Sequence, residues 1–136
     1  MLVGLPSRAV ARNFNMPDLR ETVVFDDLLH PDAIVHAPAG LSTQSAEAEK
    51  QVWREALSAI SDLHHDVQEA VVDGGLEMAR VIVTGTMQTE FGGVAGSGRS
   101  FRIDQAVITH LRDGKVEEAW EIADIAALRQ QVQGDQ

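Results

Sequence analysis

The stretch Ile108–Asp124, ITHLRDGKVEEAWEIAD, decides how the rest of the chain is interpreted. Its central Asp113-Gly114 pair is typical of a two-residue hairpin turn, because both central residues of a type I′ turn need positive φ. On either side, apolar and polar residues alternate, as in strands with one buried face. We therefore predict two antiparallel strands, with Arg112 paired to Lys115.

Counting outward from this turn assigns one face of the hairpin to the interior. Val107 then faces Trp120, Ile103 faces Asp124, and paired residues share a face. The mostly apolar face is the predicted inside, and it holds Phe101, Ile103, Gln105, Val107, Thr109, Leu111, Val116, Glu118, Trp120, Ile122 and Asp124. The opposite face holds Arg102, Asp104, Ala106, Ile108, His110, Glu117, Ala119, Glu121 and Ala123.

Asp124 is the unusual member of the predicted inner face. A buried carboxylate becomes easier to protonate, which suits a general acid or base near neutral pH. Its position before the apolar run IAALRQQV also suits an ordinary helix N-cap, and both interpretations stay open. A β-bulge near Gln105-Ala106 would swap the faces and send Arg102 and Asp104 inward.

The sequence pattern on either side of this hairpin predicts one α+β domain over residues 1–136. Helices come first and hairpin strands follow, an order that favours α+β over a parallel α/β fold. The glycine-rich connection Phe91–Gly98 precedes a strand rather than a helix, so it is predicted to be a loop and not a phosphate cradle. The predicted helices are Ser7–Asn15, Pro17–Leu29, one capped by Ser45, and Asp124–Gln131; the predicted strands are Pro31–Gly40, His65–Val72, Met78–Glu90, Phe101–Leu111 and Val116–Ala123.

The amino-acid composition limits which kinds of molecule this protein is expected to bind. The net charge is -10, from 11 basic and 21 acidic residues, which disfavours nucleic acid and anionic membranes. There are no cysteines, and the five histidines show no metal-ligand spacing, so we expect no metal or cofactor. No apolar run reaches the roughly 20 residues of a membrane span. A cytoplasmic protein is therefore the expectation.

Three segments together resemble the SnoaL-like polyketide cyclase family of the nuclear-transport-factor-2-like superfamily. They are RVIVTGTMQTEFGGVAGSGRSFRI, ITHLRDGKVEEAWEIAD and LRQQV. The resemblance implies a cone-shaped α+β barrel, also called cystatin-like, in which a curved, mostly antiparallel sheet wraps over three helices and a short C-terminal helix follows. It also implies a homodimer formed through the outer face of the sheet.

The resemblance further implies a cofactor-free enzyme that closes rings in a small apolar or polyketide-like substrate by an intramolecular aldol reaction. Asp124 matches the acid/base of the family's Trp-x-x-x-Asp motif, and His36 and His110 are the nearest matches to its pocket histidines. Ala37 stands where related ketosteroid isomerases carry a base, which argues against steroid isomerisation. The predicted substrate pocket is lined by Phe14, Trp53, Val83, Phe101, Arg102, Val107, Trp120 and Ile122.

Two alternatives remain beside the aldol cyclase. Limonene-type epoxide hydrolases of the same superfamily use an Asp-Arg-Asp set, and Arg102, Asp104 and Asp124 supply those residue types. Epoxide hydrolysis, or epoxide opening to a cyclic ether, needs Arg102 and Asp104 inside the fold. A small-ligand-binding module without chemistry is the other alternative, since one fold hosts many functions.

Overall fold

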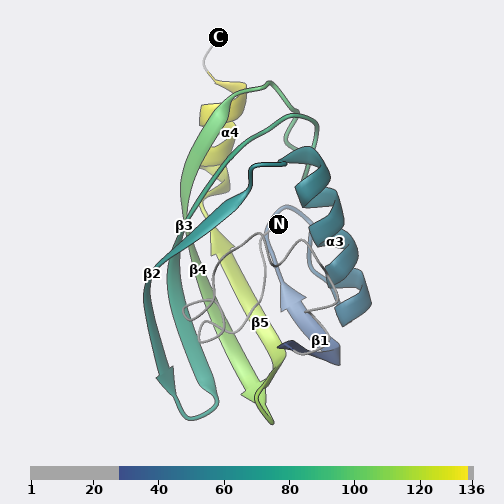
Figure 1. The fold of residues 1–136 in the computed structure, drawn as a ribbon, viewed down its shortest axis with the longest axis vertical. Helices are drawn as coiled ribbons and strands as arrows, with labels where there is room; N and C mark the ends of the chain where they lie inside the picture. Colours follow the sequence, from purple (N-terminus) through teal and green to yellow (C-terminus); the bar gives the residue numbers. More distant parts are fainter. Residues whose placement is uncertain (1–27, 135–136) are drawn as a thin grey trace.

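The computed structural model describes residues 28–134, which form one five-stranded sheet and two helices (Figure 1). This mixed architecture confirms the predicted α+β class. The predicted helix Ser7–Asn15, most of Pro17–Leu29, and Phe14 lie outside the described residues. In chain order the elements are β1 (Leu29–His36), α3 (Ala46–Ala59), β2 (His64–Asp73), β3 (Leu76–Thr86), β4 (Ser100–Arg112), β5 (Lys115–Ala123) and α4 (Ile125–Gln133).

The sheet has the order β1-β5-β4-β3-β2. Strands β2 to β5 form the predicted antiparallel meander, and β1 adds to its edge parallel to β5, with Val35 beside Ala119. Leu29, predicted to end a helix, instead begins β1. Asp113 and Gly114 have φ of 56° and 79°, as the predicted type I′ turn requires.

Helix α3 covers one face of the sheet, here called the inner face. The hydroxyl of Ser45 accepts the Ala48 N–H at 3.1 Å, which confirms the predicted N-cap. The end of α3 lies close against β3, since a Cβ on Gly85 would come within 2.5 Å of Ile60 Cγ2. The core between helix and sheet includes Trp53, Ala56, Ile60, Val81, Val83, Phe101 and Ile103.

The faces of β4 agree with the prediction. Its buried residues are Phe101, Ile103, Gln105, Val107 and Thr109, at every second position. The intervening side chains point to the opposite, outer face. No bulge occurs near Gln105, because the pairing of β4 with β3 runs without a shift from Leu76 to Thr86.

The faces of β5 are the reverse of the prediction beyond Val116. Leu111 pairs with Val116, but His110 pairs with Glu118, so Glu117 is an extra residue in a β-bulge. Each later residue is therefore turned to the other side. Trp120 now faces Ile108, not Val107. The prediction that Glu118, Trp120 and Ile122 lie inside is wrong for this reason.

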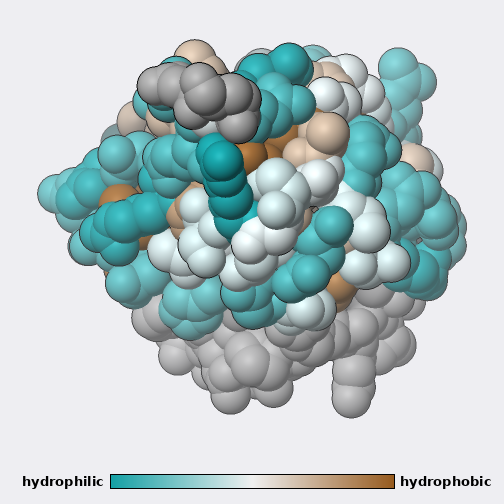
Figure 2. Space-filling model, turned by 90° about the horizontal axis from the view of Figure 1, so that it is seen from above, coloured by the Kyte–Doolittle hydropathy of each residue, from teal (hydrophilic) through white to brown (hydrophobic). Residues whose placement is uncertain are grey.

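Asp124 is exposed and forms the N-cap of α4. Its Oδ1 accepts the Ala127 N–H at 2.9 Å. Helix α4 buries Leu128 and Val132, and the Ser97 hydroxyl donates to the Val132 carbonyl at 2.7 Å. These contacts join α4 to the β3–β4 connection at one end of the molecule. Figure 2 shows that end as mostly hydrophilic and neutral residues with small hydrophobic areas between them.

Candidate functional site on the inner face

Polar side chains interrupt the apolar inner face of the sheet. Glu77 and Thr109 are directly paired across β3 and β4 and are fully buried. Gln105, four residues before Thr109 on the same face of β4, is paired with Val81. Glu121 on β5 is paired with Val107, which lies between Gln105 and Thr109 on β4. The sheet thus brings four buried polar side chains to its inner face, and we call them the interior polar group: Glu77, Gln105, Thr109 and Glu121.

Glu121 is the carboxylate best placed for proton transfer. It is 5% exposed and its β5 neighbours on the same face are Ala119 and Ala123. Both neighbours are small, and the facing Val107 is apolar. A carboxylate held in such a place is a candidate to take a proton from a bound molecule and return it.

His65 lies further along the same face, on β2. It is 4% exposed, and its ring lies 5.6 Å from that of Trp53 at an angle of 46°. Burial lowers the pKa of His65 to about 3, and the nearby positive charge of His64 adds to this shift. His65 is therefore a neutral imidazole at physiological pH.

Three residues of the predicted site do meet, but on the outer face. The rings of His36 and Trp120 stack at 5.1 Å and 16°, and the His110 ring meets Trp120 edge-on at 4.9 Å. His36 Nε2 also lies 2.6 Å from a Glu118 oxygen. The predicted pocket-facing positions of His36 and Trp120 are wrong because the bulge turns Trp120 outward, and β1 places His36 beside it.

The Asp-Arg-Asp set is also on the outside. Asp124 is an exposed cap, Arg102 is exposed, and Asp104 forms an exposed ion pair with Arg80 at 3.5 Å. Ile122, predicted to line the pocket, is 59% exposed. Because the epoxide alternative needs Arg102 and Asp104 inside, this arrangement contradicts it.

Four predicted pocket residues do lie on the inner side. Trp53, Val83, Phe101 and Val107 are each at most 5% exposed, and the first three belong to the core between α3 and the sheet. Their contact with a substrate stays a prediction.

Sequence reasoning missed the interior residues Glu121 and His65. One signal for Glu121 is present: Val116 and Ala119 are three positions apart, whereas residues on one face of a regular strand are two or four apart. An extra residue between them, in a β-bulge, allows both side chains to face the interior. For His65, the alternation of β2 holds at its start, where His65 and Val67 share a face, but one histidine beside another gives no local sign of burial.

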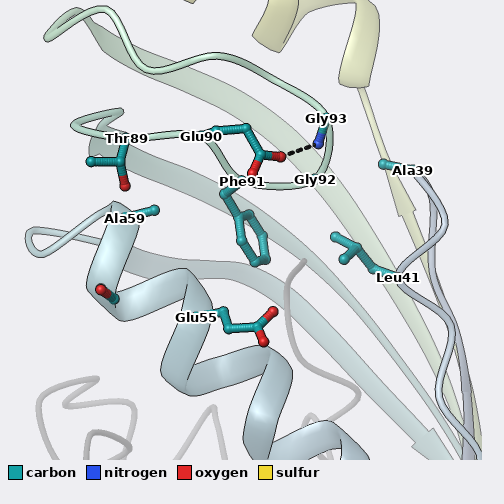
Figure 3. A pocket seen from close by; sticks show the side chains of 10 residues that line it. Ala39, Leu41, Glu55, Ala59, Thr89, Glu90, Phe91, Gly92 and Gly93 are labelled. Carbon is teal, nitrogen blue, oxygen red and sulfur yellow. Dashed lines mark hydrogen bonds between the residues drawn. The ribbon is translucent and has the colours of Figure 1, made fainter.

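A separate cleft of about 500 Å³ opens at the loop end of the molecule (Figure 3). It lies between the turn after β1, the end of α3 and the β3–β4 connection, and Phe91 projects toward α3 there. Glu90 accepts the Gly93 N–H at 2.8 Å, which holds the loop in shape. None of the predicted site residues lines this cleft.

Within residues 28–134, no group of three histidine, aspartate or glutamate side chains is arranged to hold a metal ion. Neither described helix has the length and apolar character needed to cross a membrane.

Comparison with known proteins relates the chain to one family. The family model described as SnoaL-like polyketide cyclase matches residues 8–132. The structure of IdmH from Streptomyces antibioticus, named as a candidate polyketide cyclase, is 28% identical with a TM-score of 0.72, covering 90% of this chain and 91% of that chain. TsrD from Streptomyces laurentii is 25% identical with a TM-score of 0.73, covering 82% and 81%.

More distant structures support the fold alone. A SnoaL-like protein from Jannaschia sp. CCS1 is 18% identical with a TM-score of 0.77, covering 85% of this chain and 80% of that chain. A Catenulispora acidiphila protein described by a ketosteroid isomerase-like fold has a TM-score of 0.69. The described sheet and helices therefore have the expected nuclear-transport-factor-2-like fold. No curated protein sequence matches the chain.

Proposed function

Because the chain belongs to the SnoaL-like polyketide cyclase family, we propose that it closes a ring in a polyketide-like substrate inside the fold. The observation that carries this proposal is the burial of Glu121 on the inner face, at 5% exposure. We assign to Glu121 the acid/base role that the sequence alone suggested for Asp124. Asp124 is exposed and caps α4, so a bound substrate inside would not reach it.

The proposed reaction needs one group that takes and returns a proton. The Glu121 carboxylate removes a proton from the carbon between two substrate carbonyls, leaving an enolate. The enolate carbon attacks the carbon of another carbonyl elsewhere in the substrate, and a carbon–carbon bond forms as the π bond of that carbonyl breaks. The oxygen of that carbonyl becomes an alkoxide and takes the proton back from Glu121. A positioned acid/base of this kind contributes about 10²–10⁴-fold to the rate.

The other interior residues would orient the chain and exclude water. Thr109 is buried and pairs with Ala119, two residues before Glu121 on the same face of β5, and its hydroxyl would donate to a developing oxyanion beside Glu121. An apolar lining that excludes water would come from the buried side chains of Val83, Phe101 and Val107. Holding the two reacting carbons in contact supplies a further part of the rate, because the reaction becomes effectively unimolecular.

The test is ring closure of a linear substrate. We expect the purified chain to convert an N-acetylcysteamine thioester of a linear tetraketide into a cyclic isomer or its dehydration product, detected by liquid chromatography and mass spectrometry. In D₂O, deuterium should enter the carbon between the carbonyls. Binding of the thioester without conversion or deuterium uptake above the buffer control would favour a ligand-binding module and sink the cyclase proposal.

We also propose that two copies of the chain associate through the outer face of the sheet. An apolar stripe crosses all five strands there, formed by Val71, Met78, Ile108, Trp120 and His36, which lie in register. Met78 is 43% and Val71 63% exposed, and Ile122 beside the stripe is 59% exposed. An apolar surface of this extent rimmed by charges is typical of an interface.

Substituting Met78→Arg and Ile122→Arg together should separate the dimer. Each places an unpaired charge in the proposed interface, where burial costs several kcal/mol. Light scattering should fall from twice 14.8 kDa to 14.8 kDa, while Ala126→Arg on the exposed side of α4 should leave the mass unchanged. A wild-type chain already at 14.8 kDa at high concentration would contradict the proposal.

A further inference from the structure

The cleft of about 500 Å³ at the loop end has no part in the proposed ring closure. Its described walls are the turn after β1, the C-terminal half of α3 and the β3–β4 connection (Figure 3). No member of the interior polar group lines it. A hollow of this volume is within the range of sites that bind small molecules, so the cleft is a second candidate site.

The β3–β4 wall of the cleft is shaped by the chain itself. Phe91 and Val94 exchange two backbone hydrogen bonds, each of 3.0 Å, around Gly92 and Gly93, whose φ values are 61° and 78°. These are the features of a tight type I′ turn. A Cβ on Gly92 would come 3.2 Å from Leu41 Cδ1, so this turn packs against the loop after β1. The wall therefore needs no ligand to hold its form.

The chemistry of the cleft combines an apolar floor with two carboxylates. The ring of Phe91 lies between Glu55 on α3 and Glu90 on the connection (Figure 3). One oxygen of Glu55 accepts the Gln51 amide at 3.0 Å, and one oxygen of Glu90 accepts the Gly93 N–H at 2.8 Å. The Oε1 atom of each carboxylate accepts no hydrogen bond from another described residue. No lysine, arginine or histidine is among the described lining residues.

From this geometry we propose that the cleft binds a small organic ammonium ion. Its charged end lies between Glu55 and Glu90, and its apolar part lies against Phe91 and Leu41. This inference goes beyond the proposed function, because it assigns a second ligand to a different part of the molecule.

The charge of the cleft selects a cation over other ligands. Glu55 and Glu90 come from two different elements and approach one ring from two sides, and the face of an aromatic ring also attracts a cation. The net charge of -10 adds to this attraction and repels anions. A neutral molecule of the same shape would gain only the contact with the apolar floor.

Three probes that differ in one group test the assignment. We expect 2-phenylethylammonium to bind the full chain at least about fivefold more tightly than 2-phenylethanol, the factor that two exposed ion pairs of ordinary strength give together. The anion 3-phenylpropionate should bind more weakly than either. In ¹⁵N NMR titrations the amide signals of Leu41, Gly92 and Gly93 should move, and the preference for the cation should shrink in about 0.5 M salt.

A double variant separates charge from shape. Glu55→Gln with Glu90→Gln keeps an oxygen that can accept from Gln51 and from the Gly93 N–H, so the preference for the cation should vanish while 2-phenylethanol binds as before. The matched control is Glu47→Gln, eight residues earlier on α3 and about 12 Å away along the helix. It removes the same charge outside the cleft and should keep the preference. Unchanged ¹⁵N spectra away from the cleft would show that each variant is folded.

A lysine side chain of another protein offers the same ammonium group. N-acetyl-lysine methylamide represents it and should bind more weakly than 2-phenylethylammonium, because it has no ring to cover Phe91 and Leu41. Tighter binding of the lysine compound would overturn the assignment to a small molecule. Equal binding of the cation and the alcohol, an unchanged preference in the double variant, or no movement of the cleft amides would overturn the site itself.

These outcomes are independent of turnover. Ring closure is proposed on the inner face of the sheet, so its absence would leave the ammonium site standing. Loss of the ammonium site would in turn leave the cyclase proposal standing, because Glu121 does not line the cleft.

Discussion

Glu121→Gln is expected to lower the rate of ring closure by about 10²–10⁴-fold, the usual contribution of a positioned general acid or base. Glutamine keeps the shape of the side chain but cannot take a proton from carbon. Because Glu121 is 5% exposed, a neutral amide of equal size should fit there without loss of folding. The initial rate with the tetraketide thioester, and deuterium uptake in D₂O, measure the effect.

Asp124→Asn is the matched control. It lies three residues along the chain, carries the same kind of substitution, and removes a charge at the N-terminus of α4. Asparagine is also a good N-cap, so the hydrogen bond to the Ala127 N–H can persist. The rate should stay within about threefold of the wild type, since the outer position of Asp124 gives it no part in proton transfer. A large loss in Asp124→Asn with little loss in Glu121→Gln would reverse our assignment.

The second large effect is on stability in acid. The pKa of His65 is lowered to about 3 in the folded chain, against about 6.5 in the unfolded chain. Between these values the unfolded state binds more protons than the folded state, so stability falls as the pH falls. The difference between the two pKa values corresponds to about 5 kcal/mol once the pH is well below 3, and about 2 kcal/mol of this is lost between pH 7 and pH 5.

His65→Phe should remove this part of the acid sensitivity. Urea unfolding at pH 7, 6 and 5 should show the variant gaining about 2 kcal/mol relative to the wild type over that range. Carboxylates that titrate in both proteins cancel in the difference. His64→Gln should retain most of the slope, because burial, not the charge of His64, is the larger cause of the shift. Parallel curves for wild type and His65→Phe would show that His65 is protonated in the folded state.

Local sequence was sufficient for the types of the described elements and for most of their faces. The Asp113-Gly114 turn follows from the positive φ that both residues adopt, the Ser45 cap from a hydroxyl that accepts a backbone N–H, and the faces of β4 from strict alternation. Each depends on neighbours within a few positions. The α3 residue Trp53, predicted to line the pocket, is buried.

The sequence pattern of neighbouring residues could not show that the carboxylate of Glu121 lies on the inner face. Alternation states which residues of β5 share a face, but it does not state which face that is. One extra residue, Glu117, shifts the pairing between His110 and Leu111, and every later side chain changes sides. This single shift takes Trp120 and Ile122 out of the predicted interior and brings Glu121 into it.

The amino-acid sequence by itself therefore determined a family, an α+β meander and the turns that join its strands, because these depend on backbone preferences of a few adjacent residues. Only the tertiary structure decided that Glu121 and His65 are the interior groups, and that His36, His110 and Trp120 gather outside. The physical reason is that strand register is set by hydrogen bonds between distant segments and by the burial of both Val116 and Ala119, and one residue of β5 is left unpaired in the ladder as a result.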